Sequence, residues 1–148
     1  MTGRPSPPRL FLDSDVVLAG SASPNKHSAS LLLLRMGELG LIENFVSIQV
    51  MQEIERNLQS KLPTARPVFQ TLAARSLHVV ENPAPPELEM HQGRAHQKDL
   101  AILVSAFREQ CRWLVTFHQR HYQPGLKEVQ ILSPGQAILR IRAVLSEV

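Results

Sequence analysis

The chain has 148 residues, of which 43% are hydrophobic, 20% are charged and 5% are aromatic. This length suits one domain with a single core, and the composition differs from that of disordered and membrane proteins. The formal net charge of +3 permits binding to a polyanion such as nucleic acid without requiring it.

The first nine residues, MTGRPSPPR, hold three prolines and no apolar segment of the kind found in signal peptides. We expect residues 1–8 to form a disordered lead-in and residues 9–148 to form the single domain. No apolar run approaches the roughly 20 residues that a membrane helix needs. The lone cysteine, Cys111, suits a reducing compartment and an inert core position. These features predict a cytoplasmic protein.

Short apolar strands alternate with helices along the whole chain. Ser23-Pro24 supplies an N-cap and a first-turn proline for the first predicted helix, and Pro63 interrupts the second. A proline-rich loop, NPAPPELEMHQGRA, follows the third strand. In chain order we predict a strand over 9–13, a helix from 23 to about 40, a strand over 42–47, helices over 48–61 and 64–76, a strand over 76–81, a helix over 97–110, strands over 113–116 and 129–132, and a last helix from Pro134.

This alternation predicts a mostly parallel sheet, because parallel neighbours require helical crossovers. The expected fold class is a three-layer α/β/α sandwich, with helices on both faces of the sheet. Ligands of such sheets bind beyond the carboxyl ends of the strands, near the switch point of strand order. Asp13 ends the first predicted strand and therefore lies at that edge.

Two aspartates, Asp13 and Asp15, interrupt the apolar stretch LFLDSDVVLAG. A single aspartate after a strand often caps a turn or the next helix. Two carboxylates so close together repel each other unless a cation, a proton or a group of donors lies between them. The pair therefore favours a divalent metal.

Acidic residues also follow the apolar faces of two predicted helices. Asp99 lies four residues before Leu103 and eight before Phe107, which turns its carboxylate inward. A favourable interaction with the helix dipole explains an acid in this first turn but not the face that it occupies. Glu53 and Glu55 flank the apolar stripe of the other helix on opposite sides, and periodicity does not choose between them. Mg²⁺ and Mn²⁺ take such hard oxygen ligands.

Five segments, in this order, resemble the PIN-domain nucleases, and within them the prokaryotic toxin-like branch that is often paired with antitoxins. LFLDSDVVLAG resembles the opening strand with its Asp-x-Asn/Asp motif, and VMQEIERNL resembles the helix that carries a glutamate. HQKDLAILVSAF is similar to the His-x-Lys-Asp helix start, and WLVTFHQRHY to the strand that ends in threonine. VQILSPGQAIL resembles the closing strand, proline and helix. No single motif is specific, but their order and spacing together are much more so.

Carried over by position, the resemblance implies that Asp13, Glu53 and Asp99 are the catalytic, metal-coordinating acids. It selects the first of the two helix glutamates. Asp15 stands where the family often has asparagine and is implied as a further ligand. Thr116 is implied to orient a carboxylate or a metal-bound water.

The segment after Thr116 departs from the family pattern. The family commonly has a fourth acid there, whereas this chain has Phe117-His118. His118 is a candidate metal ligand in place of that acid. Alternatively, His118 contacts a phosphate when its imidazole is protonated, or it is a plain polar loop residue.

The resemblance implies a metal-dependent endoribonuclease that uses Mg²⁺ or Mn²⁺ to cleave single-stranded RNA, as the toxin of a toxin–antitoxin pair. Bound metal supplies the attacking water and neutralises charge on the phosphate, so no nucleophilic side chain is required. The implied partners are an antitoxin and a second copy of the chain. Basic residues that are candidates for phosphate contacts, or else plain surface charges, are Lys98, Arg112, Arg120 and His121.

Two other functions share parts of this pattern. A receiver domain also has an acidic pair, Mg²⁺ and a threonine, but it needs an aspartate ending its third strand, where LHVVENP carries Glu81. The other alternative keeps the fold: a degenerate PIN domain that acts as a non-catalytic RNA- or protein-binding module. The observation that favours it is His118 in place of the family's fourth acid. That module predicts little metal binding, no cleavage, and association that survives mutation of Asp13.

Overall fold

The computed structural model describes residues 6–22, 25 and 28–147. In this part of the chain, five strands form one sheet in the order β3-β2-β1-β4-β5, and every neighbouring pair is parallel. The strand order changes direction after β1, which places the switch point between the neighbouring strands β1 and β4. The strands are β1 (Arg9–Leu12), β2 (Glu43–Ser47), β3 (Leu77–Val80), β4 (Trp113–Val115) and β5 (Gln130–Leu132).

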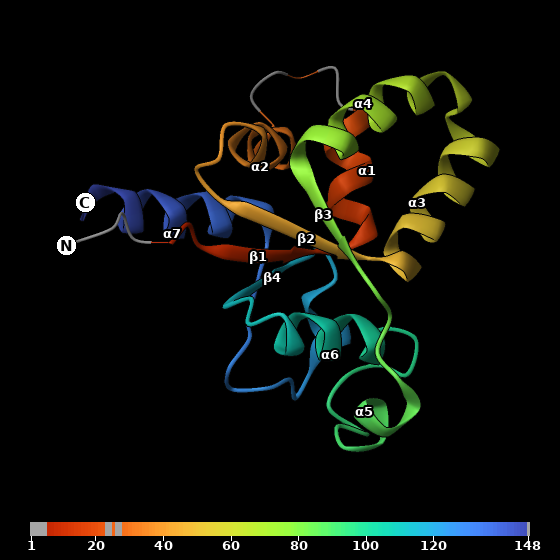
Figure 1. Cartoon of the computed structure of the whole chain (residues 1–148), viewed down its shortest axis with the longest axis vertical. Helices are drawn as coiled ribbons and strands as arrows, with labels where there is room; N and C mark the ends of the chain where they lie inside the picture. Colours follow the sequence, from red (N-terminus) through yellow and green to blue (C-terminus); the bar gives the residue numbers. More distant parts are fainter. Residues whose placement is uncertain (1–5, 23–24, 26–27, 148) are drawn as a thin grey trace.

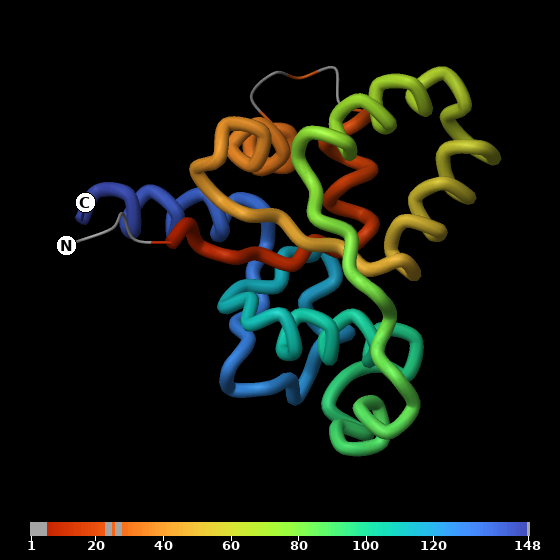
Figure 2. The backbone as a smooth tube through the Cα atoms, in the orientation of Figure 1, coloured from red at the N-terminus to blue at the C-terminus, as the bar shows by residue number. Residues whose placement is uncertain are grey.

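Helices cover both faces of this sheet, which confirms the predicted α/β/α sandwich (Figure 1). The tube in Figure 2 shows α6 and α5 on one side of β1 and β2, and the other helices on the opposite side. That larger layer contains α1 (Ser14–Ala22), α2 (Ala29–Glu38), α3 (Ile48–Lys61), α4 (Arg66–Ser76) and α7 (Pro134–Ser146). The smaller layer contains α5 (Pro85–Glu89) and α6 (Leu100–Arg108). Two short 3₁₀ helices, η1 (Pro63–Ala65) and η2 (Gln119–Tyr122), lie in connections.

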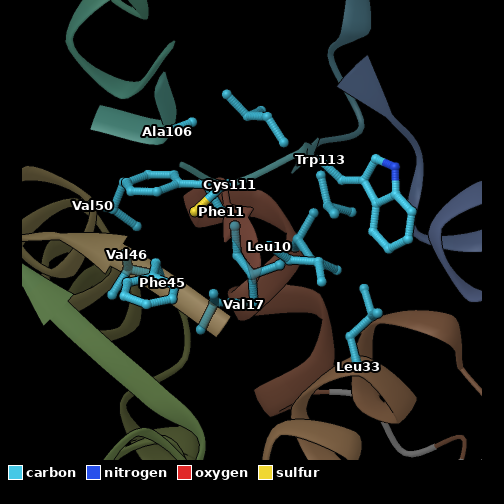
Figure 3. Close-up of a cluster of buried hydrophobic side chains, with 14 of the residues drawn as sticks. Leu10, Phe11, Val17, Leu33, Phe45, Val46, Val50, Ala106, Cys111 and Trp113 are labelled. Atoms are coloured by element: carbon cyan, nitrogen blue, oxygen red, sulfur yellow. The ribbon is translucent and has the colours of Figure 1, made fainter. Parts of the chain in front are cut away.

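The core lies on both faces of the central strand. Leu10 and Phe11 of β1 are fully buried, as expected for a parallel strand with helices on either side. Figure 3 shows the sheet residues between Leu33 of α2 and Ala106 of α6. Cys111 is a core residue as predicted, and burial raises the pKa of its thiol to about 12.

The sequence prediction missed the helix α1. The predicted cap at Ser23-Pro24 lies outside the described residues, and α2 instead has Ser28 as its N-cap, with the hydroxyl accepting from the Leu31 N–H. Helices α1 and α2 approach closely at Gly20, where a Cβ would lie 2.7 Å from Cδ1 of Leu34. The structure therefore has two helices between the first two strands.

Two other segments differ from the prediction. Helix α6 begins at Leu100 rather than near 97, with Asp99 as its N-cap, and ends at Arg108. Gln110 then has a φ of 58°, in the left-handed region that ends helices. The proline-rich loop contains the short helix α5. Across the described residues, no helix is long and apolar enough to cross a membrane.

Candidate active site

Strand pairing brings Asp13 and Thr116 together at the carboxyl edge of the sheet. β1 and β4 are neighbours, and Leu12 lies opposite Val115 in their register. The next residue of each strand is Asp13 and Thr116, and the Asp13 N–H donates to the Val115 carbonyl at 3.0 Å. Residues 103 positions apart in sequence therefore share one corner of the site.

Three donors hold the carboxylate of Asp13, which is only 7% exposed. Its Oδ1 accepts from the Ser14 N–H at 2.8 Å, and its Oδ2 accepts from Thr116 Oγ1 at 2.9 Å and from the Tyr122 hydroxyl at 2.8 Å. Thr116 Oγ1 also accepts from the His118 N–H at 3.0 Å, which leaves the hydroxyl proton for Asp13. Asp13 is therefore fixed in one orientation.

Tyr122 is a site residue that sequence reasoning missed. Its side chain is fully buried, and its hydroxyl reaches Asp13 from η2. Burial and the nearby Asp13 carboxylate raise the pKa of Tyr122 above its ordinary value, so the hydroxyl stays protonated and donates. The residue spacing carries no signal for this contact, because it depends on how the chain after β4 folds back.

We expect Tyr122→Phe to lower the free energy of unfolding by about 1.5–3 kcal/mol, the usual contribution of a hydrogen bond to a charged group. The ring keeps its packing, so the loss reports the hydroxyl. Urea unfolding of both proteins measures it, and an unchanged midpoint would show that the hydroxyl does not stabilise Asp13 in solution.

The structure selects Glu53 from the two helix glutamates as the neighbour of Asp13. Ser47 caps α3, and Glu53, in the second turn of that helix, faces the start of α1. Glu53 Oε2 accepts from Ser14 Oγ at 3.0 Å, and its Oε1 accepts from Gln49 Nε2 at 3.1 Å. Glu55 instead pairs with Arg66 at 3.0 Å, away from this group. Ser14 and Gln49 were not predicted, although Ser14 directly follows Asp13.

Asp99 reaches the same edge from the start of α6. Its side chain is 18% exposed, and its Oδ2 lies 3.1 Å from Nδ1 of His121. Burial and the negative charges of Asp13 and Glu53 raise the pKa of Asp99, while His121 opposes this shift. The Asp99 carboxylate therefore faces inward, as its position on the helix predicted. Leu103 one turn on is buried, although Phe107 is 36% exposed.

The two carboxylate oxygens of Asp15 have different surroundings. Its Oδ2 accepts from the Phe117 N–H at 3.0 Å and lies 3.6 Å from Nε2 of His118, while its Oδ1 is buried with no hydrogen-bond partner. Burial and the charge of Asp13 raise its pKa to about 6. A buried carboxylate oxygen without a donor favours a cation beside it.

The chemistry of these acids fits a divalent cation, although they do not form a preformed cage. Hard carboxylate oxygens from three chain segments meet at one edge, and burial together with the charge of Asp13 raises the pKa of both Asp15 and Asp99. Among the described residues, no three His, Cys, Asp or Glu side chains are arranged as ligands of a single ion. The donors around Asp13 leave part of its acceptor capacity free.

The predicted basic residues divide into two groups. Arg120 and His121 belong to η2, beside the acids, and the Lys98 carbonyl accepts from Gln49 Nε2 at 3.4 Å. Arg112 precedes β4 and so lies at the amino edge of the sheet, where it contacts the Trp113 ring at 4.9 Å. A strand separates it from Thr116, so the structure does not bring Arg112 to the site.

The fold and the site together define an α/β/α domain with a cluster of acids at the carboxyl edge of a parallel sheet. The chain belongs to the PIN domain family, whose sequence profile matches residues 9–120. PIN domains are generally nucleases and typically use divalent metals.

The comparison with solved structures agrees on the fold. VapBC2 from Rickettsia felis bound to a DNA fragment from its promoter matches with a TM-score of 0.61 and 15% sequence identity. The match covers 83% of this chain and 96% of that chain. No curated protein matches by sequence.

Proposed function

We propose that the protein is a metal-dependent endoribonuclease that cleaves single-stranded RNA. The observation that carries the proposal is the meeting of Asp13, Asp15, Glu53 and Asp99 at the sheet edge, with a buried Asp15 oxygen that has no donor. Membership of a nuclease family supports the same conclusion.

Mg²⁺ or Mn²⁺ held by these acids would supply an activated water and neutralise charge on the phosphate. The chain's own residues orient the ligands. Thr116 and Tyr122 fix Asp13, while Ser14 holds Glu53. Such fixed carboxylates lose little freedom when a cation binds, which favours catalysis. We include His118 as a further ligand, since it replaces the family's fourth acid and lies beside Asp15.

Basic side chains near the acids support an RNA backbone as substrate. Lys98, Arg120 and His121 are exposed around the acidic edge, and the net charge of the chain is +3. Contacts from such residues to phosphates supply most non-specific affinity and make it salt-dependent. Arg112, at the other edge, has no place in this contact.

We propose that the enzyme is the toxin of a toxin–antitoxin pair, acts in the cytoplasm and forms homodimers. The structural likeness to VapBC2, and the resemblance of the motifs to toxin-like PIN domains, support this role. An antitoxin would inhibit cleavage by covering the acidic edge, because substrate and metal both bind there.

Cleavage of a fluorogenic single-stranded RNA tests the function. Purified wild-type protein is incubated with Mn²⁺, Mg²⁺ or EDTA, using several RNA sequences and checking that no inhibitor co-purifies. We expect cleavage with metal and none in EDTA, because metal supplies the activated water. Inactivity with both metals on every RNA would contradict the proposal.

The non-catalytic binding module is the second candidate. His118 in place of an acid, and the lack of a preformed ligand cage among the described residues, favour it. It predicts RNA binding that is unaffected by EDTA, without cleavage, and the same assay followed by a binding measurement separates the two functions.

A further inference from the structure

A pocket of about 300 Å³ lies in the segment that follows Thr116, beside the acidic cluster. We propose that this pocket binds one unstacked nucleobase of the single-stranded substrate, with the Phe117 ring as its stacking surface. The proposal rests on the proposed function and extends it to a base-binding subsite. The pocket is lined by Phe117, His118, Gln119, Arg120 and His121.

Phe117 presents an aromatic face that the fold does not use. Its side chain is 53% exposed, although the neighbouring Val115 and Thr116 are fully buried. Among the described residues, no aromatic or imidazole ring stacks on Phe117. Exposing a large apolar ring to water costs free energy, so its position in the lining of a pocket favours a ligand with a flat apolar face.

Imidazole rings provide a further planar wall. His118 and His121 stack with ring centroids 5.0 Å apart and planes 12° apart, and His121 also stacks on His96 at 5.1 Å. Single-stranded bases stack on phenylalanine and histidine rings, and Arg120 adds a positive charge for the adjoining phosphate. The volume suits one base, at the small end of ligand pockets.

The loop that forms the pocket is held in place before any ligand binds. The His121 N–H donates to the His118 carbonyl at 3.0 Å, and the His96 N–H donates to the His121 carbonyl at 2.6 Å. Gln119 Nε2 donates to the Ile131 carbonyl at 3.3 Å and to Gln136 Oε1 at 3.0 Å. Such a rigid platform loses little conformational entropy when a base stacks on it.

The same loop connects the pocket to the acids. The Phe117 N–H donates to Asp15, His118 lies 3.6 Å from Asp15, and His121 lies 3.1 Å from Asp99. A base seated here would place its phosphate close to these carboxylates. The pocket therefore positions the strand for cleavage, in addition to adding affinity.

The test measures binding of short fluorescent single-stranded RNAs to the full chain in EDTA, so that the RNA stays intact. One set is complete, and the other has a single abasic nucleotide moved along the strand, which keeps the charge and removes one base. We expect one abasic position to weaken wild-type binding about tenfold, as for the loss of one stacked base.

Phe117→Ala should weaken binding of the complete RNA by a similar factor and abolish the difference between complete and abasic strands. The alanine keeps the backbone N–H that donates to Asp15. Phe117→Trp, which keeps an aromatic face at this position, should bind the complete RNA as tightly as the wild type does. Phe107→Ala is the matched control, because that exposed ring lies on α6 against His91. Wild-type affinity in Phe117→Ala would overturn the subsite alone. Absence of binding by every variant and by the wild type would overturn the single-stranded RNA substrate and the subsite with it.

Discussion

Asp99→Asn is expected to lower the rate of RNA cleavage by at least about 100-fold, as expected for the loss of a charged metal ligand. Asparagine keeps the size of the side chain and an oxygen near His121, but it removes the negative charge. Burial, and repulsion from Asp13 and Glu53, raise the pKa of the Asp99 carboxyl, and the change to asparagine removes both of these costs. The variant should therefore be at least as stable as the wild type.

Cleavage rates with saturating Mn²⁺, together with circular dichroism and urea unfolding, check this expectation. Glu55→Gln is the matched control, because Glu55 is an acid of α3 that pairs with Arg66 outside the acidic group. It should keep nearly full activity. Wild-type cleavage by Asp99→Asn would remove Asp99 from the site.

Asp13→Asn is expected to abolish cleavage as well and, unlike Asp99→Asn, to destabilise the fold by about 2 kcal/mol. The Asp13 carboxylate accepts hydrogen bonds at both oxygens, including one from Thr116 and one from Tyr122 at the same oxygen. An amide replaces one acceptor with a donor, so at least one buried donor loses its partner. The charge-assisted character of the remaining bonds is also lost.

Urea unfolding of Asp13→Asn beside Asp99→Asn measures this difference in stability. The double variant Asp13→Asn with Tyr122→Phe tests the contact directly. Both changes act on one hydrogen bond, so its loss of unfolding free energy should be smaller than the sum of the two single losses. Equal midpoints for the two aspartate variants would show that the buried contacts of Asp13 do not stabilise the fold. Additive losses in the double variant would show that the Tyr122 hydroxyl and the Asp13 carboxylate contribute independently. Inactivity of Asp13→Asn alone is thus weaker evidence for metal chemistry than inactivity of Asp99→Asn.

Much of the fold was predictable from local patterns. The helix over 48–61 coincides with α3, since its apolar spacing and Pro63 are local signals. The parallel sandwich followed from the alternation of strands and helices. Helix α1 was missed because only Asp13, Ser14 and Asp15 separate its short apolar run from the strand before it, and neither run is long enough to show a change of period. Helix α2 starts later than predicted because Ser28 is its N-cap, with the hydroxyl accepting from the Leu31 N–H.

The sequence by itself determined the sheet, its helical layers and the placement of Asp13 at a strand end, because burial patterns and breakers act over a few residues. The family resemblance implied that Asp13, Glu53 and Asp99 belong to one site, but only the tertiary structure decided which side chains contact one another there. Glu53 was separated from Glu55 by contact with Ser14, Tyr122 was brought to Asp13 by the loop after β4, and Arg112 was left at the far edge. These outcomes depend on strand order and register, which join residues distant in sequence and leave no local period to detect.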